Sequence, residues 1–395
     1  MNIFVLSPRS CSPPDTGAKL REYHLLRNLA HRGSQIELLA FRAPNDHPEP
    51  VDFARWAAFP RPPGYTPKVL AGAVLRRVPF TTWRFRDAAF GQAVEDRLKA
   101  LPDSPDWLWM ESIHMESYRP LLARLAPATP QVWNWHNIES EVLWRYARAA
   151  PTPLHGWYAR HTARLLERVE RSVLASPVAL NLVCSQREAD LLRGWVPSAR
   201  IAVVPNGVDT SAFRPIPLDE RRQHVLFVGS LDYAPNIEAL QFFVRQVWPG
   251  VRARFPKTEF RIVGSRPVPA VQALASHPGI RLVGPVPRVE PHYETARVAV
   301  VPLFSGGGTR LKVLEAFAAG VPLVSTGLGI EGIDAQPDTH YLAAESAADW
   351  LAAIECMLGD LPRAAALAST ARQRAESHYD WAAITARLAE QLRTV

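Results

Sequence analysis

The sequence predicts an α/β protein with two Rossmann-like, doubly wound parallel sheets. Short apolar runs alternate with helical patterns along the chain, as expected for parallel strands covered by helices on both faces. The length of 395 residues is about twice that of a typical domain. A polar, proline-bearing segment at 210–223 separates two strand series, and we interpret it as an interdomain linker.

The first half, residues 1–205, predicts one domain. A helix over 18–32 carries apolar residues at helical spacing and stops at Gly33, as helices often do. A proline-rich stretch at 43–67 has no periodicity and predicts an irregular surface segment. A long helical region is expected at 153–177. The expected strands are 2–7, 35–41, 107–111, 131–136, 178–184 and 200–204.

Residues 206–377 are expected to form the other domain. A final helix at about 378–395 is expected to pack either on this domain or back on the first domain. The expected strands are 224–230, 259–265, 280–284, 297–304 and 321–327. The expected helices near the end are 347–358, 363–376 and 380–393. We expect the two sheets to face each other across a cleft that holds the ligands.

Composition narrows the class of protein. The three cysteines have no metal-ligand spacing and favour reduced thiols in the cytoplasm. The N-terminus does not resemble a signal peptide, and no apolar run reaches the ~18 residues of a membrane span. Residues 1–210 hold 26 Lys and Arg against 20 Asp and Glu, whereas the remainder holds 19 against 18. The basic excess indicates either an anionic partner of the first half or a solvated basic face.

The segment RVAVVPLFSGGGTRLKVLEAFAAGVPLVST, residues 297–326, carries the most chemistry. A buried strand is expected to end at Phe304, and a helix is expected to begin near Thr309. A glycine-rich turn at such a place lets backbone N–H groups approach phosphate oxygens at a positive helix terminus. The candidate phosphate ligands are Gly306, Gly307, Gly308, Thr309, Arg310 and Lys312. Lys312 and Glu315 share one helix face, because they lie three residues apart.

This succession of a strand, a loop, a Glu inside LEAFAAG and then VPLVST resembles the donor-binding signature of retaining family-4 glycosyltransferases, which have the GT-B fold. The resemblance implies that Glu315 holds the ribose hydroxyls of a nucleotide. The first of the family's two glutamates falls on Gly307 here, as in a subgroup with a GGGTRLK loop, similar to bacterial exopolysaccharide sugar transferases. The resemblance to this subgroup implies that backbone amides of the loop, together with Arg310 and Lys312, take over the role of the missing carboxylate. The alternative is a flexible turn with a solvated Glu315.

A second resemblance lies in VLFVGSLDYAPNIEAL, residues 225–240. Many relatives grip the donor phosphates with an Arg and a Lys after the matching strand, but this chain has Ser230 and Asn236 at those places. Gly229 and Ser230 are then expected to offer backbone and hydroxyl donors, and more of the cationic role falls on Arg310 and Lys312. A plain strand-to-helix turn is the competing interpretation of Ser230.

In the first half, Gly17 lies where relatives have a flexible glycine loop beside the phosphates and the acceptor. In WNWHNIESEVLWRYA, residues 133–147, a strand is expected to end at His136, and the family has a His or Asp near the reacting sugar at the matching place. His136 is therefore expected to contact the transferred sugar, and Glu139 the acceptor hydroxyls. The alternatives are a structural histidine and a helix-start carboxylate stabilised by the helix dipole.

The resemblance implies transfer of a sugar from a nucleotide-diphosphate sugar to a glycan or lipid-linked acceptor, with retention, in bacterial polysaccharide or glycolipid synthesis. The donor is a substrate, so no cofactor is expected. The sequence has no Asp-x-Asp pair, and metal-independent catalysis by Arg310 and Lys312 is expected. Two alternatives stay open: a GT-B nucleotide-sugar epimerase or hydrolase, and a catalytically silent sugar-nucleotide-binding subunit.

Two segments, 74–87 and 157–173, mix arginines with aromatic residues. Basic side chains attract anionic headgroups, and aromatic rings settle at the membrane interface. These segments predict either peripheral contact with an anionic membrane at the inner face or solvated helices over the core. No nucleic-acid motif accompanies the charge, so no nucleic-acid partner is expected.

Overall fold

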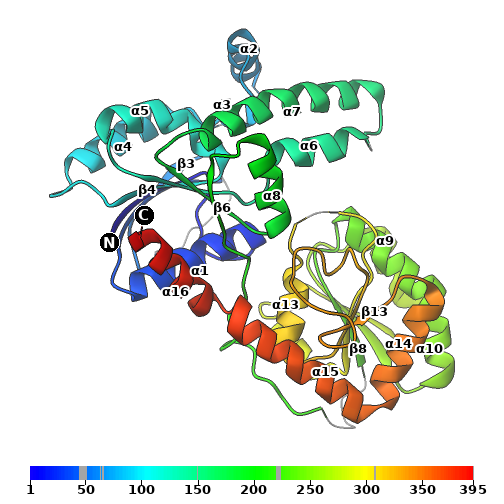
Figure 1. The fold of residues 1–395 in the computed structure, drawn as a ribbon. Coiled ribbons are helices and arrows are strands. Elements are labelled where there is room, and N and C mark those ends of the chain that lie inside the picture. Colours follow the sequence, from blue (N-terminus) through cyan, green and yellow to red (C-terminus); the bar gives the residue numbers. More distant parts are fainter. Residues whose placement is uncertain are drawn as a thin grey trace. The chain divides into compact units, whose positions relative to one another are not determined.

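The computed structural model describes residues 1–43, 51–62, 64, 66–148, 150–218, 224–306 and 308–394. The chain divides into two compact units, Met1–Pro205 with Leu388–Val395, and Asn206–Arg387. Each unit contains a parallel sheet with flanking helices (Figure 1). The predicted α/β class with two doubly wound, Rossmann-like sheets is confirmed.

The sheet of the first unit has seven strands within the described residues, in the order β3-β2-β1-β4-β5-β6-β7, and every neighbouring pair is parallel. The strand order reverses direction between β1 and β4, which is the switch point where doubly wound sheets bind ligands. The strands are β1 Asn2–Ser7, β2 Gln35–Arg42, β3 Arg55–Pro60, β4 Trp107–Glu111, β5 Gln131–Asn134, β6 Ala179–Val183 and β7 Arg200–Val203.

Helices connect these strands, as parallel pairing requires. They are α1 Gly17–His31, α2 Pro67–Arg76, α3 Phe80–Trp83, α4 Ala88–Lys99, the 3₁₀ helix η1 Ile113–Tyr118, α5 Arg119–Leu125, α6 Glu139–Arg148, α7 Pro153–Leu174 and α8 Gln186–Trp195. The central strands are buried along nearly their whole length, because helices cover both faces of the sheet. Polar residues inside such strands therefore need internal partners.

The second sheet repeats this topology with six strands in the described residues, in the order β10-β9-β8-β11-β12-β13, all parallel. Its switch point lies between β8 and β11. The strands are β8 His224–Val228, β9 Glu259–Val263, β10 Ile280–Gly284, β11 Val298–Val301, β12 Leu323–Ser325 and β13 Leu342–Ala343.

The helices of the second unit include two short π-helical segments, η2 Phe243–Val247 and η4 Ala375–Tyr379. The others are α9 Ala234–Phe242, α10 Trp248–Arg254, α11 Pro269–Gln272, the 3₁₀ helix η3 Ala273–Ser276, α12 Glu290–Glu294, α13 Leu311–Ala318, α14 Ala347–Gly359, α15 Leu361–Arg374 and α16 Trp381–Thr394. The end of α16 belongs to the first unit, where the Leu392 carbonyl accepts a hydrogen bond from Trp107 Nε1 at 3.3 Å.

Two predictions about irregular segments were wrong. The stretch 43–67 contains the edge strand β3, which pairs with β2 over six residues. This strand contains no fully buried residue and ends in a proline, which edge strands tolerate, so the sequence showed no clear strand pattern. The segment 210–223 is not a free linker in its described part, 210–218, because Phe213 packs in the core of the second unit and Thr210 Oγ1 bonds Asp380 Oδ2 at 2.6 Å. Residues 44–50, 63, 65 and 219–223 lie outside the described residues.

Three predicted boundaries near the motifs were also wrong. β11 ends at Val301 rather than at Phe304, because Pro302 has no N–H for the ladder. α13 begins at Leu311, with Arg310 at its N-cap position. β5 ends at Asn134, and His136 lies on the bend that follows.

The loops after β8 and β9 approach so closely that only glycine fits at position 264. A Cβ added to Gly264 would lie 1.7 Å from the Gly229 carbonyl oxygen. We expect Gly264→Ala to destabilise the second unit by about 1–3 kcal/mol, the usual cost of overpacking. Calorimetric melting checks this. Gly359→Ala is the control, because a Cβ there would meet no atom within 4 Å, and a melting temperature of Gly264→Ala equal to that of Gly359→Ala would contradict the packing argument.

Candidate active site

The carboxyl ends of β4 and β5 place a buried polar network beside the switch point of the first sheet. The Glu111 carboxylate accepts hydrogen bonds from Trp109 Nε1 at 2.6 Å and from Asn134 Nδ2 at 3.0 Å, and its Oε2 lies 2.6 Å from His136 Nε2. Glu111 is fully buried, and the His136 side chain is 8% exposed. This places His136, a predicted sugar contact, in a fixed orientation.

The charge states of this pair follow from burial and from the donors around it. Burial opposes the charge of Glu111, but the hydrogen bond from His136, with the Asn134 and Trp109 donors, holds the pKa of Glu111 below its ordinary value. Burial lowers the pKa of His136 more than Glu111 raises it. A neutral imidazole beside an ionised carboxylate donates through Nε2–H. Nδ1 then has a lone pair that can accept a hydrogen bond from a sugar hydroxyl.

Charged residues on the buried face of α1 extend the network. Arg21 Nε donates to Asn134 Oδ1 at 2.9 Å, and Arg21 Nη1 donates to the Val204 carbonyl at 2.7 Å. Glu22 accepts a bond from Ser7 Oγ at 2.9 Å. Burial and the negative charge of Glu111 raise the pKa of Glu22 well above its usual value. Sequence reasoning missed these residues, although charges on the core face of a helix were a signal for them.

The other two candidates of the first unit lie at helix starts. Glu139 is the first residue of α6, and burial raises the pKa of its carboxyl while the charge of Arg9 acts in the opposite direction. Gly17 is the exposed first residue of α1, whose N-cap is Thr16. The structure thus places Gly17 inside the helix start rather than in the preceding loop, where we expected it.

The second sheet carries a cation at its own switch point. Lys312, in the first turn of α13, donates from Nζ to Asn236 Oδ1 at 2.9 Å and lies 4.1 Å from the centre of the Phe227 ring. Burial lowers the pKa of Lys312 to about 7, the charge of Glu315 works against this shift, and the charge of Arg310 adds to it. An ammonium ion that is only partly stabilised by its surroundings is suited to bind an anion.

Glu315 is held one turn further along α13. The Tyr293 hydroxyl donates to Glu315 Oε2 at 2.9 Å and approaches the Lys312 carbonyl oxygen at 3.2 Å. Burial raises the pKa of Glu315, and the Tyr293 hydrogen bond and the Lys312 charge act against that rise. Tyr293 was not singled out in the sequence, because it comes from α12 and reaches Glu315 only in the folded unit.

The loop after β8 closes over Lys312. A Cβ on Gly229 would lie 2.8 Å from Lys312 Nζ and 2.9 Å from Asn236 Nδ2, so a side chain there would displace both groups. The Gly229 N–H donates to the Val263 carbonyl, so this N–H does not serve as the phosphate ligand that we predicted. Asn236 Nδ2 donates to the Ser230 carbonyl at 2.8 Å.

An arginine from a neighbouring loop contacts Ser230. Arg266, which follows β9, donates from Nη2 to Ser230 Oγ at 2.9 Å and pairs with Asp232 at 2.5 Å. No sequence signal linked Arg266 to Ser230, because the two residues meet only through the pairing of β8 with β9.

The glycine loop before α13 lies at the same sheet edge. Gly306 and Gly308 have φ values of 101° and 81°, a region that favours glycine. Thr309 is half-buried and Arg310 is buried. Gly307, at the position of the family's first glutamate, lies outside the described residues.

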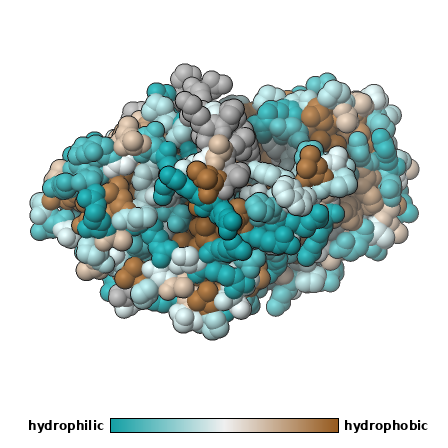
Figure 2. Space-filling view, turned by 90° about the horizontal axis from the view of Figure 1, so that it is seen from above, coloured by the Kyte–Doolittle hydropathy of each residue, from teal (hydrophilic) through white to brown (hydrophobic). Residues whose placement is uncertain are grey.

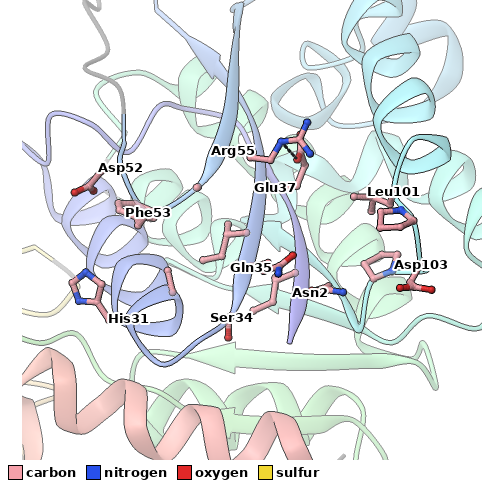
Figure 3. Close-up of a pocket in the computed structure, with 16 residues that line it drawn as sticks. Asn2, His31, Ser34, Gln35, Glu37, Asp52, Phe53, Arg55, Leu101 and Asp103 are labelled. Carbon is pink, nitrogen blue, oxygen red and sulfur yellow. Dashed lines mark ion pairs between the residues drawn. The ribbon is translucent and has the colours of Figure 1, made fainter.

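A cavity of about 700 Å³ lies away from these groups (Figure 3). Asn2, Gln35 and Arg55, which begin β1, β2 and β3, line it, so it opens at the amino ends of the strands. Glu37 pairs there with Arg55 at 3.6 Å. Doubly wound sheets bind their ligands at the opposite, carboxyl edge, and we place the candidate site at that edge.

Comparison with known proteins identifies the family of the chain. The sequence model "Glycosyltransferase Family 4" matches residues 17–212, and "Glycosyl transferases group 1" matches residues 222–360. A GDP-mannose-dependent alpha-(1-6)-phosphatidylinositol monomannoside mannosyltransferase from Mycolicibacterium smegmatis is 28% identical over 230 residues, 50% of this chain and 57% of the relative. The Mycobacterium tuberculosis protein of that description is 26% identical over 60% of this chain and 66% of its own length. The chain thus matches less than two thirds of these relatives.

Two solved structures share the fold over nearly the whole chain. Sucrose-phosphate synthase from Thermosynechococcus elongatus superposes with a TM-score of 0.73 at 19% identity, covering 100% of this chain and 99% of that one. HepE from Anabaena, in complex with UDP and glucose, gives 0.65 at 14% identity, covering 99% of each. The fold and site define a GT-B protein. The chain belongs to the family-4 glycosyltransferases, as the donor motif predicted.

Proposed function

We propose that this protein transfers a sugar from a nucleotide-diphosphate sugar to a glycan or lipid-linked acceptor. The observation that carries the proposal is the cluster at the second switch point, where Lys312 lies against Gly229 with Arg310 and the glycine turn beside it. The matched relatives support it, since they are described as GDP-mannose-dependent mannosyltransferases. The HepE structures also support it, since they contain UDP or UDP-glucose.

The residues divide the reaction between them. Lys312, Arg310 and the Ser230 N–H bind the diphosphate, and their fixed positive charge stabilises it as the leaving group without a metal ion. Glu315, oriented by Tyr293, binds the ribose hydroxyls. His136 accepts a hydrogen bond from the transferred sugar through Nδ1, and Glu139 contacts the acceptor. We propose retention, with the acceptor attacking on the face the diphosphate leaves and its proton passing to a phosphate oxygen.

Lys312 should make nucleotide binding depend on proton uptake. Its pKa is about 7 in the free protein, and a bound diphosphate favours the ammonium form and raises that pKa. GDP or UDP should therefore bind with uptake of a fraction of a proton near pH 7.5, and affinity should fall as pH rises from 7 to 9. Calorimetry in buffers of different ionisation enthalpy measures the uptake.

Lys312→Ala should abolish this uptake and weaken binding roughly ten- to a hundredfold, since charge-assisted bonds contribute about 1.5–3 kcal/mol. Lys257→Ala, at an exposed lysine of the same unit, is the control. Equal affinity and equal uptake in all three proteins would place the diphosphate elsewhere.

Transfer itself is tested by nucleotide release from a panel of nucleotide sugars with and without glycan and lipid acceptors. Acceptor-dependent release supports the proposal. Acceptor-independent conversion would indicate the epimerase or hydrolase, and binding without turnover would indicate the silent subunit.

His136→Ala should lower turnover far more than nucleotide affinity, because a contact to the reacting sugar strengthens as its bond breaks. The melting temperature of His136→Ala must be measured beside its turnover, because a folding defect would also lower turnover. Unchanged melting and unchanged turnover would show that His136 is not part of the site.

We also propose that the α6–α7 hairpin rests on an anionic membrane. None of the helices in the described ranges is long and apolar enough to span a bilayer. Leu154 and Trp157 are 71% and 60% exposed near the start of α7, close to Arg160. Figure 2 looks down on the side of α7 in Figure 1, and brown apolar groups lie there among hydrophilic ones.

The membrane proposal predicts sedimentation with vesicles that contain phosphatidylglycerol. Leu154→Ala with Trp157→Ala should lower binding severalfold, since burial of apolar surface and attraction between opposite charges both contribute. Ile216→Ala, at an exposed apolar residue of the second unit, is the control. Binding that neither depends on anionic lipid nor falls in the double variant would refute it.

A further inference from the structure

A basic pocket lies at the carboxyl edge of the first sheet. It has a volume of about 230 Å³ and is lined by Arg9, Arg61, Thr81, Arg84, Phe85 and His114. The loops after β1 and β3, the helix α3 with the residues that follow it, and the helix η1 bring these residues together. Three guanidinium groups share one small cavity, and its described lining contains no Asp or Glu.

Two polar atoms in this lining lack a hydrogen-bond partner among the described residues. Arg9 Nη1 and Thr81 Oγ1 are buried and make no hydrogen bond to the described residues. Arg9 and Arg61 also form no ion pair with any described residue. Buried cations and hydroxyls are costly to leave without partners. A bound anion would satisfy both kinds of group at once, because a phosphate oxygen accepts bonds from guanidinium and hydroxyl donors.

The lining is built to hold its shape. The Arg84 guanidinium lies 5.2 Å from the centre of the Phe85 ring, and that ring packs edge-on against His114 at 5.4 Å. His114 Nδ1 lies 2.6 Å from Ser112 Oγ. Ser112 has φ 77°, a backbone conformation that non-glycine residues rarely adopt. Such strained residues persist where the surroundings fix them, and they are frequent at ligand sites.

The pocket adjoins the residues assigned to the acceptor. The positive charge of Arg9 acts on His114 in the pocket and also on Glu139 and His136 in the polar network. Arg9, which lines the pocket, is therefore close enough for its charge to act on His136 and Glu139 as well.

We propose that the pocket binds a phosphate group on the acceptor. The inference rests on the proposed glycosyl transfer and specifies its substrate class as a phosphorylated acceptor, either a soluble sugar phosphate or a phospholipid headgroup. Arg9, Arg61 and Arg84 neutralise the phosphate, Thr81 donates to one of its oxygens, and the acceptor hydroxyl is held beside Glu139.

The first experiment measures inorganic phosphate binding by calorimetry at low ionic strength, without turnover. Arg61→Met and Arg84→Met should each weaken it at least tenfold, whereas Arg86→Met, at an exposed arginine outside the lining, should not. Lys312→Ala should retain this binding, which separates the pocket from the diphosphate site. Phosphate affinity that is unchanged in both Arg61→Met and Arg84→Met overturns the proposal, whether or not transfer is found. Arg61 is exposed, so its variant is expected to fold even where Arg84→Met is not.

The second experiment identifies the source of the phosphate. Glucose, glucose 6-phosphate and vesicles with phosphatidylinositol are compared as acceptors. Transfer to glucose 6-phosphate supports the soluble source, whereas transfer only to the vesicles supports the lipid source. In either case, Arg61→Met should raise the KM for that acceptor at least tenfold and leave nucleotide affinity unchanged. Transfer to glucose with a KM equal to that for glucose 6-phosphate overturns the proposal.

Discussion

The buried carboxylate of Glu111 is the interaction on which the active face of the first unit depends. It takes donors from its own strand, from the end of β5 and from His136. Through Asn134 it also orients Arg21, which bonds the carbonyls of Val204 and Pro205 where the chain leaves the unit. An uncompensated charge at this depth is strongly destabilising, so the strand ends, the imidazole and the exit of the chain are fixed together.

The second unit uses the same switch point with the opposite charge. The ionic group at this point is Lys312, which packs on the Phe227 ring and is bonded to Asn236. Gly229 has no side chain, and this leaves room for the ammonium group. A carboxylate with a neutral imidazole suits contacts to hydroxyls, whereas an ammonium group suits phosphate oxygens. The two sheets thus share a topology, and the residues at their strand ends give them different chemistry.

The sequence predicted what is contiguous in the chain. The strand, the glycine turn and the helix with Lys312 and Glu315 were recognisable because they follow one another within one segment. Glu111 and Asn134 were missed, since they meet only through the register of β4 with β5. β3 was missed for a different reason: it is an edge strand with no fully buried residue, so its sequence shows neither a buried apolar run nor an apolar–polar alternation.

Arg266 shows how the fold can provide a positive charge that is missing from a motif in the sequence. The family resemblance implies an Arg after the strand that matches β8, whereas this chain has Ser230. A guanidinium group reaches Ser230 Oγ from the loop after β9, and Arg266 adopts φ 55° to do so. Backbone strain of this kind costs about 1–3 kcal/mol. The bonds to Ser230 and Asp232 offset part of that cost, and a donor phosphate that binds beside Ser230 would add to them. A cation thus lies at this sheet edge, although the residue after β8 itself is a serine.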